Sequence, residues 1–66
     1  MRLASVAVPV PFLDPLTYRV PDGLVTPLPG ARVLVPLGTR TVTGCVVRRG
    51  ATGDRNLKDL IDVLDA

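Results

Sequence analysis

The side chains that could do chemistry in this 66-residue chain are few and scattered, and histidine is absent. With a single cysteine and no histidine, no metal site can be assembled at the usual ligand spacing. No general base stands beside Cys45 to activate its thiol, so we predict a buried thiol that packs as a small hydrophobic side chain. Asp59 and Asp62 are close in sequence, so a pair for general acid–base catalysis is conceivable. Because they lie in a charged tail, we expect them to be solvated charges instead. The residues therefore predict a binding module without a catalytic or metal site.

Basic charge is concentrated in one part of the chain. Five basic residues against one acid lie between Arg40 and Lys58, whereas the tail beyond them carries three aspartates. Seven of the eight basic residues are arginines, whose planar guanidinium suits phosphates and base edges. Residues 38–44 begin and end with glycine but lack the ending of a nucleotide-binding P-loop. The pattern fits phosphate contacts near Arg40, or equally a solvated strand end and loop.

The elements that must position these residues are short strands. Seven prolines and six glycines argue against long helices before residue 56, and the valines favour strands. Segments bounded by turn residues predict strands over residues 3–8, 16–20, 31–35 and 40–49. Pro9 and Pro11 predict an extended, polyproline-like connection, and Pro36 is expected to end the third strand. Gly44 predicts a bulge or a sharp bend within the fourth strand.

The tail fits two structures. Its apolar residues follow the spacing of a helix that Asn56 could cap, which allows a short helical turn near residues 56–60. Residues 60–64 also fit a short buried strand. Either way the chain predicts one all-β domain over residues 1–66, a small curled sheet or partly open barrel.

No segment approaches the roughly 20 apolar residues of a membrane span. Prolines also interrupt the N-terminal apolar run that a signal peptide would need. We therefore expect a cytoplasmic protein without a membrane partner.

Several motifs, read in order, resemble the N-terminal domain of PriA-type replication-restart helicases, also called primosomal protein N′. They are Val8-Pro-Val-Pro11, Pro15-Leu-Thr-Tyr-Arg-Val-Pro-Asp-Gly23, Pro29-Gly-Ala-Arg-Val-Leu-Val-Pro-Leu-Gly38, Thr43-Gly-Cys-Val-Val47, Leu57-Lys58 and Ile61-Asp-Val-Leu-Asp65. The match covers nearly the whole chain, apart from a variable loop around residues 50–55. The resemblance implies a compact β fold similar to a rearranged OB-type barrel. It also implies an extended tail, so we favour the strand over the helix.

The family resemblance further implies a DNA-binding function. In that family the domain recognises the 3′-hydroxyl end of the nascent leading strand at a stalled replication fork. ATPase lobes, a winged-helix domain and a zinc-binding region follow in the same polypeptide. We therefore expect an excised domain without helicase activity or a cofactor of its own, while ATP, magnesium and zinc belong to the parent helicase. The expected partners are DNA 3′ ends and forks, the downstream helicase domains, and single-strand-binding and other primosome proteins.

The resemblance implies a pocket for the DNA end. Tyr18, Gly38 and Lys58 match the family's positions, whereas Leu16 and Thr17 stand where the family has an aromatic residue and an aspartate. Leu16 cannot stack a base, a contact usually worth about 1–3 kcal/mol. Thr17 can accept a hydrogen bond from a sugar hydroxyl, without the strength that a carboxylate's charge gives.

Arg40 is the further phosphate contact that we expect, and Asp14 could replace the missing carboxylate if its loop folds back. Each pocket residue also has an ordinary structural explanation. Tyr18 could be a core aromatic with a local hydroxyl partner, Gly38 a turn residue and Lys58 an exposed charge. The competing function is a small β-barrel that docks onto its own downstream domains or onto replication proteins.

Overall fold

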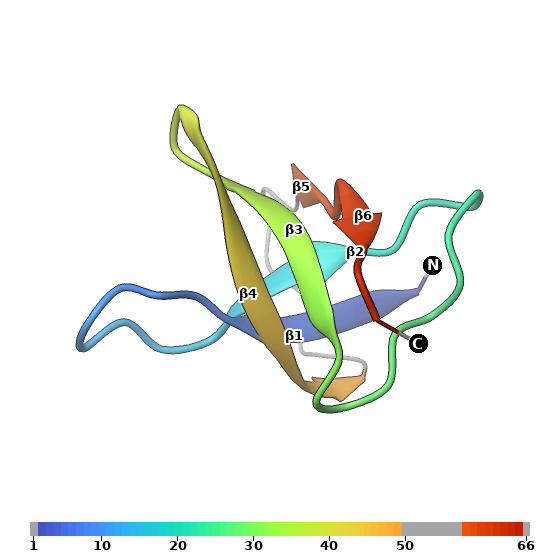
Figure 1. Ribbon diagram of the computed structural model, residues 1–66, viewed down its shortest axis with the longest axis horizontal. Coiled ribbons are helices and arrows are strands. Elements are labelled where there is room, and N and C mark those ends of the chain that lie inside the picture. Colours follow the sequence, from blue (N-terminus) through green and yellow to red (C-terminus); the bar gives the residue numbers. More distant parts are fainter. Residues whose placement is uncertain (1, 50–57, 66) are drawn as a thin grey trace.

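The computed structural model describes residues 2–49 and 58–65, which form an all-β domain (Figure 1). Its strands are β1 (Leu3–Ala7), β2 (Leu16–Arg19), β3 (Arg32–Leu37), β4 (Arg40–Arg49), β5 (Lys58–Asp59) and β6 (Asp62–Val63). They form one sheet in the order β5-β2-β1-β4-β3-β6. The four strands predicted from the turn-bounded segments are confirmed, to within two residues at each end.

The tail holds the two sides of the curled sheet together. β5 pairs in parallel with β2, whereas β6 pairs antiparallel with β3. Between them, the Leu60 N–H donates to the Arg19 carbonyl and the Ile61 N–H to the Leu34 carbonyl, both at 2.8 Å. Consecutive residues thus bind opposite sides of the sheet, which curls it into a half-barrel. The predicted curled, OB-like domain is confirmed.

The extended tail is confirmed over residues 58–63. A helical turn is wrong over residues 58–60, because their backbone pairs with β2 instead of with itself. Residues 56 and 57 lie outside the described residues, and so does the helix cap considered at Asn56.

Aliphatic side chains fill the inside of the half-barrel. Alternate residues of each strand point inward, as a pleated sheet requires. The buried apolar side chains that form this core are Ala4, Val6, Val8, Tyr18, Val20, Val33, Val35, Val46 and Leu60. The core is therefore assembled from every long strand and from Leu60, one of the two residues that join β5 to β6.

Gly44 lies where β1 and β4 approach each other closely. A Cβ added there would be 2.5 Å from Val6 Cγ1 and 2.9 Å from the carbonyl oxygen of Ala7. The predicted bulge lies further along β4, because Val6 pairs with Val46 while Ser5 pairs with Arg48. The extra residue between these pairs ends the inward alternation, and the last residues of β4 are all exposed.

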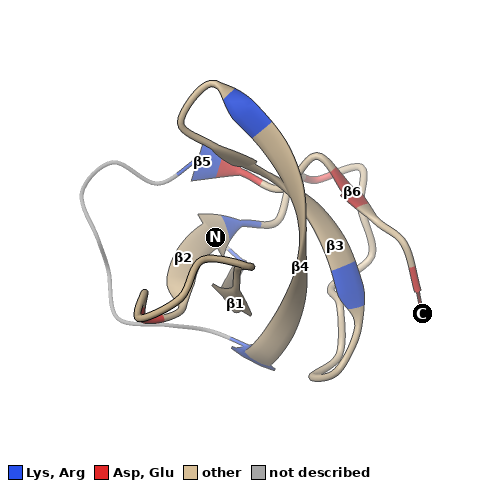
Figure 2. Cartoon of the chain, turned by 60° about the vertical axis from the view of Figure 1, so that its left-hand side comes forward, with Lys and Arg blue, Asp and Glu red and all other residues tan. Residues whose placement is uncertain are grey.

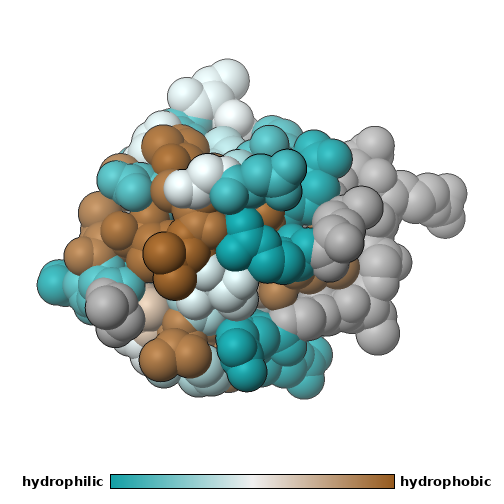
Figure 3. Space-filling view, turned by 90° about the vertical axis from the view of Figure 1, so that its right-hand side faces the viewer, coloured by the Kyte–Doolittle hydropathy of each residue, from teal (hydrophilic) through white to brown (hydrophobic). Residues whose placement is uncertain are grey.

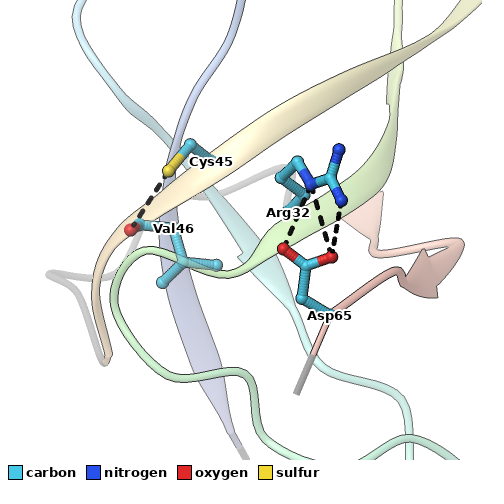
Figure 4. A network of polar contacts seen from close by, with 4 residues as sticks. All are labelled: Arg32, Cys45, Val46 and Asp65. Carbon is cyan, nitrogen blue, oxygen red and sulfur yellow. Dashed lines mark hydrogen bonds and ion pairs between the residues drawn. The ribbon is translucent and has the colours of Figure 1, made fainter.

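Cys45 is exposed, so the prediction of a buried thiol is wrong. Its neighbours Gly44 and Val46 both point inward, and alternation along the strand therefore turns Cys45 outward. Its thiol lies 3.9 Å from the carbonyl oxygen of Val46 (Figure 4).

Pro36 does not end the third strand, because β3 continues to Leu37. The carbonyls of Arg32, Leu34 and Pro36 accept hydrogen bonds from donors other than β4. The nitrogen of Pro36 therefore also faces away from β4, and β6 pairs no further along β3 than Leu34. A proline fits this position, since an unpaired edge needs no N–H donor.

The connection from β1 to β2 is not the extended segment predicted from Pro9 and Pro11. The Val10 N–H donates to the Val8 carbonyl at 2.8 Å, and the Leu13 N–H donates to the Val10 carbonyl at 3.4 Å. Phe12 has a φ of 65°, the left-handed region. The chain must reverse here to bring β2 antiparallel to β1, and two successive turns accomplish that reversal.

Candidate nucleic-acid interface

Tyr18 belongs to the core and is hydrogen-bonded to the end of β3. Its side chain is 3% exposed, and its hydroxyl donates to the carbonyl oxygen of Pro36 at 2.7 Å. Burial raises the pKa of the Tyr18 phenol above its ordinary value. The ring is therefore not a stacking surface. It fixes the backbone just before Gly38, and that is its contribution to the site.

We expect Tyr18→Phe to lower the free energy of unfolding by about 1 kcal/mol, because the Pro36 carbonyl loses its donor. Urea denaturation at neutral pH measures this loss. The pKa is raised in the folded state, so the stability gained from the neutral phenol is complete below pH ~10 and lost as the pH rises further. The variant should accordingly lose less stability than the wild type between pH 9 and 11. Parallel losses in the two proteins would argue against the buried phenol.

Lys58 and Gly38 come to one end of the half-barrel. Lys58 is exposed and lies in register with Tyr18 across β2 and β5. Gly38 is exposed in the turn between β3 and β4, with a φ of 62° that suits glycine. Arg40 follows this turn and pairs with Leu37. Figure 2 shows basic residues both on β5 and near the tip of the β3–β4 hairpin, at this same end.

Leu16 and Thr17 occupy opposite faces of β2. Leu16 is half-buried and packs against the core, on the side of Tyr18. Thr17 points to the outer face, where it lies in register with Ser5. The structure thus brings Leu16, Tyr18 and Lys58 to the inner side of the sheet and separates Thr17 from them.

A polar pocket on the outer face was not predicted from the sequence. It has a volume of about 470 Å³ and is lined by Ser5, Asp14, Pro15, Val47 and Arg48. Ser5 lies in register with Thr17 on one side and with Arg48 on the other. The sequence indicated only that the loop carrying Asp14 could fold back. Its other walls come from β1 and β4, distant in sequence.

Two arginines are already neutralised by carboxylates. Arg19 Nε lies 2.9 Å from Asp59 Oδ1, and Arg32 Nε lies 3.1 Å from Asp65 Oδ2 (Figure 4). Hydrogen bonds from Arg32 hold the pKa of Asp65 below its usual value and raise that of Arg32. Across residues 2–49 and 58–65, the exposed basic side chains that form no ion pair are Arg40, Arg48, Arg49 and Lys58.

A second surface feature, a mostly apolar groove, lies beside the C-terminal residues. It has a volume of about 440 Å³ and lies between residues 23–28 and residues 62–65. Val25 is 80% exposed there, and Figure 3 shows apolar side chains gathered on this face. Of its two charged lining residues, Asp65 is paired with Arg32, and Asp62 would repel phosphate.

Within the described residues, no group of three His, Cys, Asp or Glu side chains is placed to hold a metal ion. No helix in that part of the chain is long and apolar enough to cross a membrane.

Comparison with known proteins agrees with the sequence motifs. The family model of the PriA 3′DNA-binding domain (3′BD) matches residues 5–66, nearly the whole chain. No curated protein matches the chain closely. With an all-β half-barrel and exposed basic side chains on its surface, the chain belongs to the family of PriA 3′DNA-binding domains.

Proposed function

We propose that this DNA-binding module recognises the 3′-hydroxyl end of the nascent leading strand at stalled replication forks. The observation that carries the proposal is the convergence of Lys58 and Gly38, which are distant in sequence, at one end of the half-barrel. Tyr18 is the link between them, through its register with Lys58 and its hydrogen bond to Pro36.

Each residue of the proposed site has a physical role. The Lys58 ammonium and the Arg40 guanidinium bind the last phosphates, so affinity falls steeply with salt. Gly38 lets the terminal sugar approach the backbone, because nothing lies within 4 Å of the place its side chain would occupy. Leu16 offers apolar contact, whereas the Thr17 hydroxyl lies on the opposite face of β2, outside this group of residues. Base identity matters little, since backbone groups carry no sequence information.

The test is a comparison of single strands that end in a 3′-hydroxyl or a 3′-phosphate, at low and moderate salt. We expect the 3′-phosphate strand to bind about five- to tenfold more weakly, as the loss of one good hydrogen bond would cause. Fluorescence anisotropy of a 5′-labelled strand measures both affinities. Equal affinities would refute end recognition, and absence of binding would favour an interaction module.

A pair of charge-matched variants locates the contact. Lys58→Gln should weaken binding and reduce the slope of log affinity against log salt by about 1. Arg32→Gln removes the same charge at the start of β3, five residues and about 17 Å from the turn after Leu37. That variant should leave the affinity unchanged. Equal effects of the two changes would indicate a diffuse charge effect instead of a site.

We further infer that the module acts in the cytoplasm as part of a replication-restart helicase. Other domains of that helicase would supply ATP-dependent unwinding, magnesium and zinc. The apolar groove between residues 23–28 and 62–65 favours a second function, docking onto those domains or onto single-strand-binding and other primosome proteins.

A further inference from the structure

Phe12 is presented to solvent in a way that the fold itself does not explain. Its side chain is 107% exposed, and its backbone φ is 65°. A bulky residue in the left-handed region is an outlier, and an aromatic ring in water forgoes the stabilisation of burial. Both features disfavour phenylalanine in the free domain. Backbone outliers of this kind are concentrated at binding sites.

The β1–β2 loop holds Phe12 in place. A hydrogen bond of 2.8 Å closes the turn from Val8 to Val10, and one of 3.4 Å closes the turn from Val10 to Leu13. Pro9 and Pro11 each fix a backbone dihedral in these turns. Figure 1 shows the loop projecting from the sheet on the side opposite to β6 and the C-terminal end. The ring is therefore fully exposed on a constrained, projecting loop, where it is free to contact a ligand.

The same loop forms a wall of the polar pocket. Asp14 and Pro15 face Ser5, Val47 and Arg48 across a space of about 470 Å³. Phe12 lies two residues before Asp14, so their Cα atoms are at most about 7 Å apart. Arg48 forms no ion pair with any described residue. The β1–β2 loop thus carries an exposed aromatic ring two residues before a carboxylate, and that carboxylate lines the same pocket as the Arg48 guanidinium.

These three groups match the parts of an unpaired nucleotide. A base can stack on a phenyl ring whatever its identity, a guanidinium binds phosphate, and a carboxylate accepts from the amino group of a base. Among the described residues, Phe12 and Tyr18 are the aromatic ones, and Tyr18 is buried. Phe12 is therefore the ring available for stacking.

We propose that Phe12 and the pocket beside it form a second DNA-contact site, which binds an unpaired nucleotide of single-stranded DNA. Phe12 stacks the base, Arg48 binds the adjoining phosphate, and Asp14 accepts a hydrogen bond from the base edge. The proposal rests on the proposed function in taking DNA as the ligand. It does not depend on recognition of a 3′ end.

The chain contains no tryptophan, so Phe12→Trp places a single indole at the site. We expect its fluorescence to be quenched when a DNA strand binds, because stacking on a base brings indole and base into contact. An abasic strand of the same length should bind through its phosphates and leave the emission nearly unchanged. Val25→Trp, on the apolar groove, is the matched control and should respond to neither strand.

Phe12→Gly separates binding from stability. Glycine accepts the positive φ, so this variant should unfold at the same or a higher urea concentration than the wild type. Its affinity for single-stranded DNA should nevertheless fall by about five- to 100-fold, the range expected for one lost stacking contact. Arg48→Gln should weaken binding and reduce its salt dependence.

Unchanged affinity in Phe12→Gly, or an unquenched Phe12→Trp in a saturated complex, would overturn the proposal. If the preference for a 3′-hydroxyl persists in that case, end recognition stands without this site. If quenching is seen without any preference for a 3′-hydroxyl, the second site stands and the end-recognition proposal fails. Absence of DNA binding would overturn both.

Discussion

Replacing Gly44 by alanine should lower the free energy of unfolding by about 1–3 kcal/mol, the usual cost of overpacking a core. The new Cβ would lie 2.5 Å from Val6 Cγ1 and 2.9 Å from the carbonyl oxygen of Ala7. Val6 is fully buried, and side chains in a close-packed interior have little freedom to move aside. The carbonyl is part of the β1 backbone, so β1 and β4 must move apart to relieve the contact.

Gly23→Ala is the matched control. Nothing lies within 4 Å of its would-be Cβ, and its φ is not in the left-handed region. The same methyl group should therefore leave stability unchanged, or raise it by about 0.4–1 kcal/mol through reduced freedom of the unfolded chain. Urea denaturation of both variants compares the two positions. Equal losses would contradict a steric origin at Gly44.

The expected loss at Gly44 is large for this domain. A single core in a chain below about 70–80 residues rarely supplies more than 3–5 kcal/mol of stability. A loss of 2 kcal/mol would therefore leave a noticeable unfolded fraction at 37 °C. The apparent DNA affinity would fall in proportion to the fraction that remains folded, although Gly44 has no place in the proposed DNA site.

Local patterns in the sequence predicted the strands well. A strand over residues 16–20 puts Leu16 and Tyr18 on one face and Thr17 on the other, because side chains alternate along a strand, and the structure has this arrangement. Turn residues marked the strand ends because proline and glycine restrict or extend the backbone angles locally.

Features that depend on distant pairing were harder to predict. The side on which Cys45 lies follows from the inward position of Gly44, which only the close approach of β1 reveals. The polar pocket requires Ser5 to pair with Arg48 and the loop at Asp14 to fold back over both. No local pattern encodes such contacts, because they depend on strand register across the sheet.

In the tail, too, pairing with distant strands overrides the local sequence pattern. Helical spacing would have placed Leu60, Ile61 and Leu64 together on one apolar face. In the structure Leu60 is 2% exposed, while Ile61 and Leu64 are 49% and 44% exposed. The backbone groups left unpaired on β2 and β3 decide the outcome, because an extended segment can bind both of them.

Leu60→Ala should therefore have the largest effect on stability, about 2–5 kcal/mol, as expected for a buried leucine replaced by alanine. Leu60 is the core residue that the tail contributes, and it lies between β5 and β6. Its loss weakens the hold of the tail on both sides of the half-barrel. At this magnitude much of the domain would be unfolded at 37 °C.

Ile61→Ala is a control in the adjacent residue. Both residues donate a backbone hydrogen bond of 2.8 Å across the sheet, and they differ in side-chain burial. A change at the half-exposed Ile61 should cost less than about 1 kcal/mol. Circular dichroism during urea titration measures both, and comparable losses would contradict closure of the barrel by Leu60.

The same pair of variants tests whether closure positions the DNA site. Lys58 lies two residues before Leu60, and its register with Tyr18 depends on β5 remaining bound to β2. At 10 °C and without denaturant, where both variants are compared in the folded state, Leu60→Ala should still show a weaker preference for a 3′-hydroxyl than Ile61→Ala. If folded Leu60→Ala prefers a 3′-hydroxyl as strongly as Ile61→Ala does, the buried Leu60 side chain is not needed to hold β5. The position of Lys58 would then depend on the pairing of β5 with β2 alone.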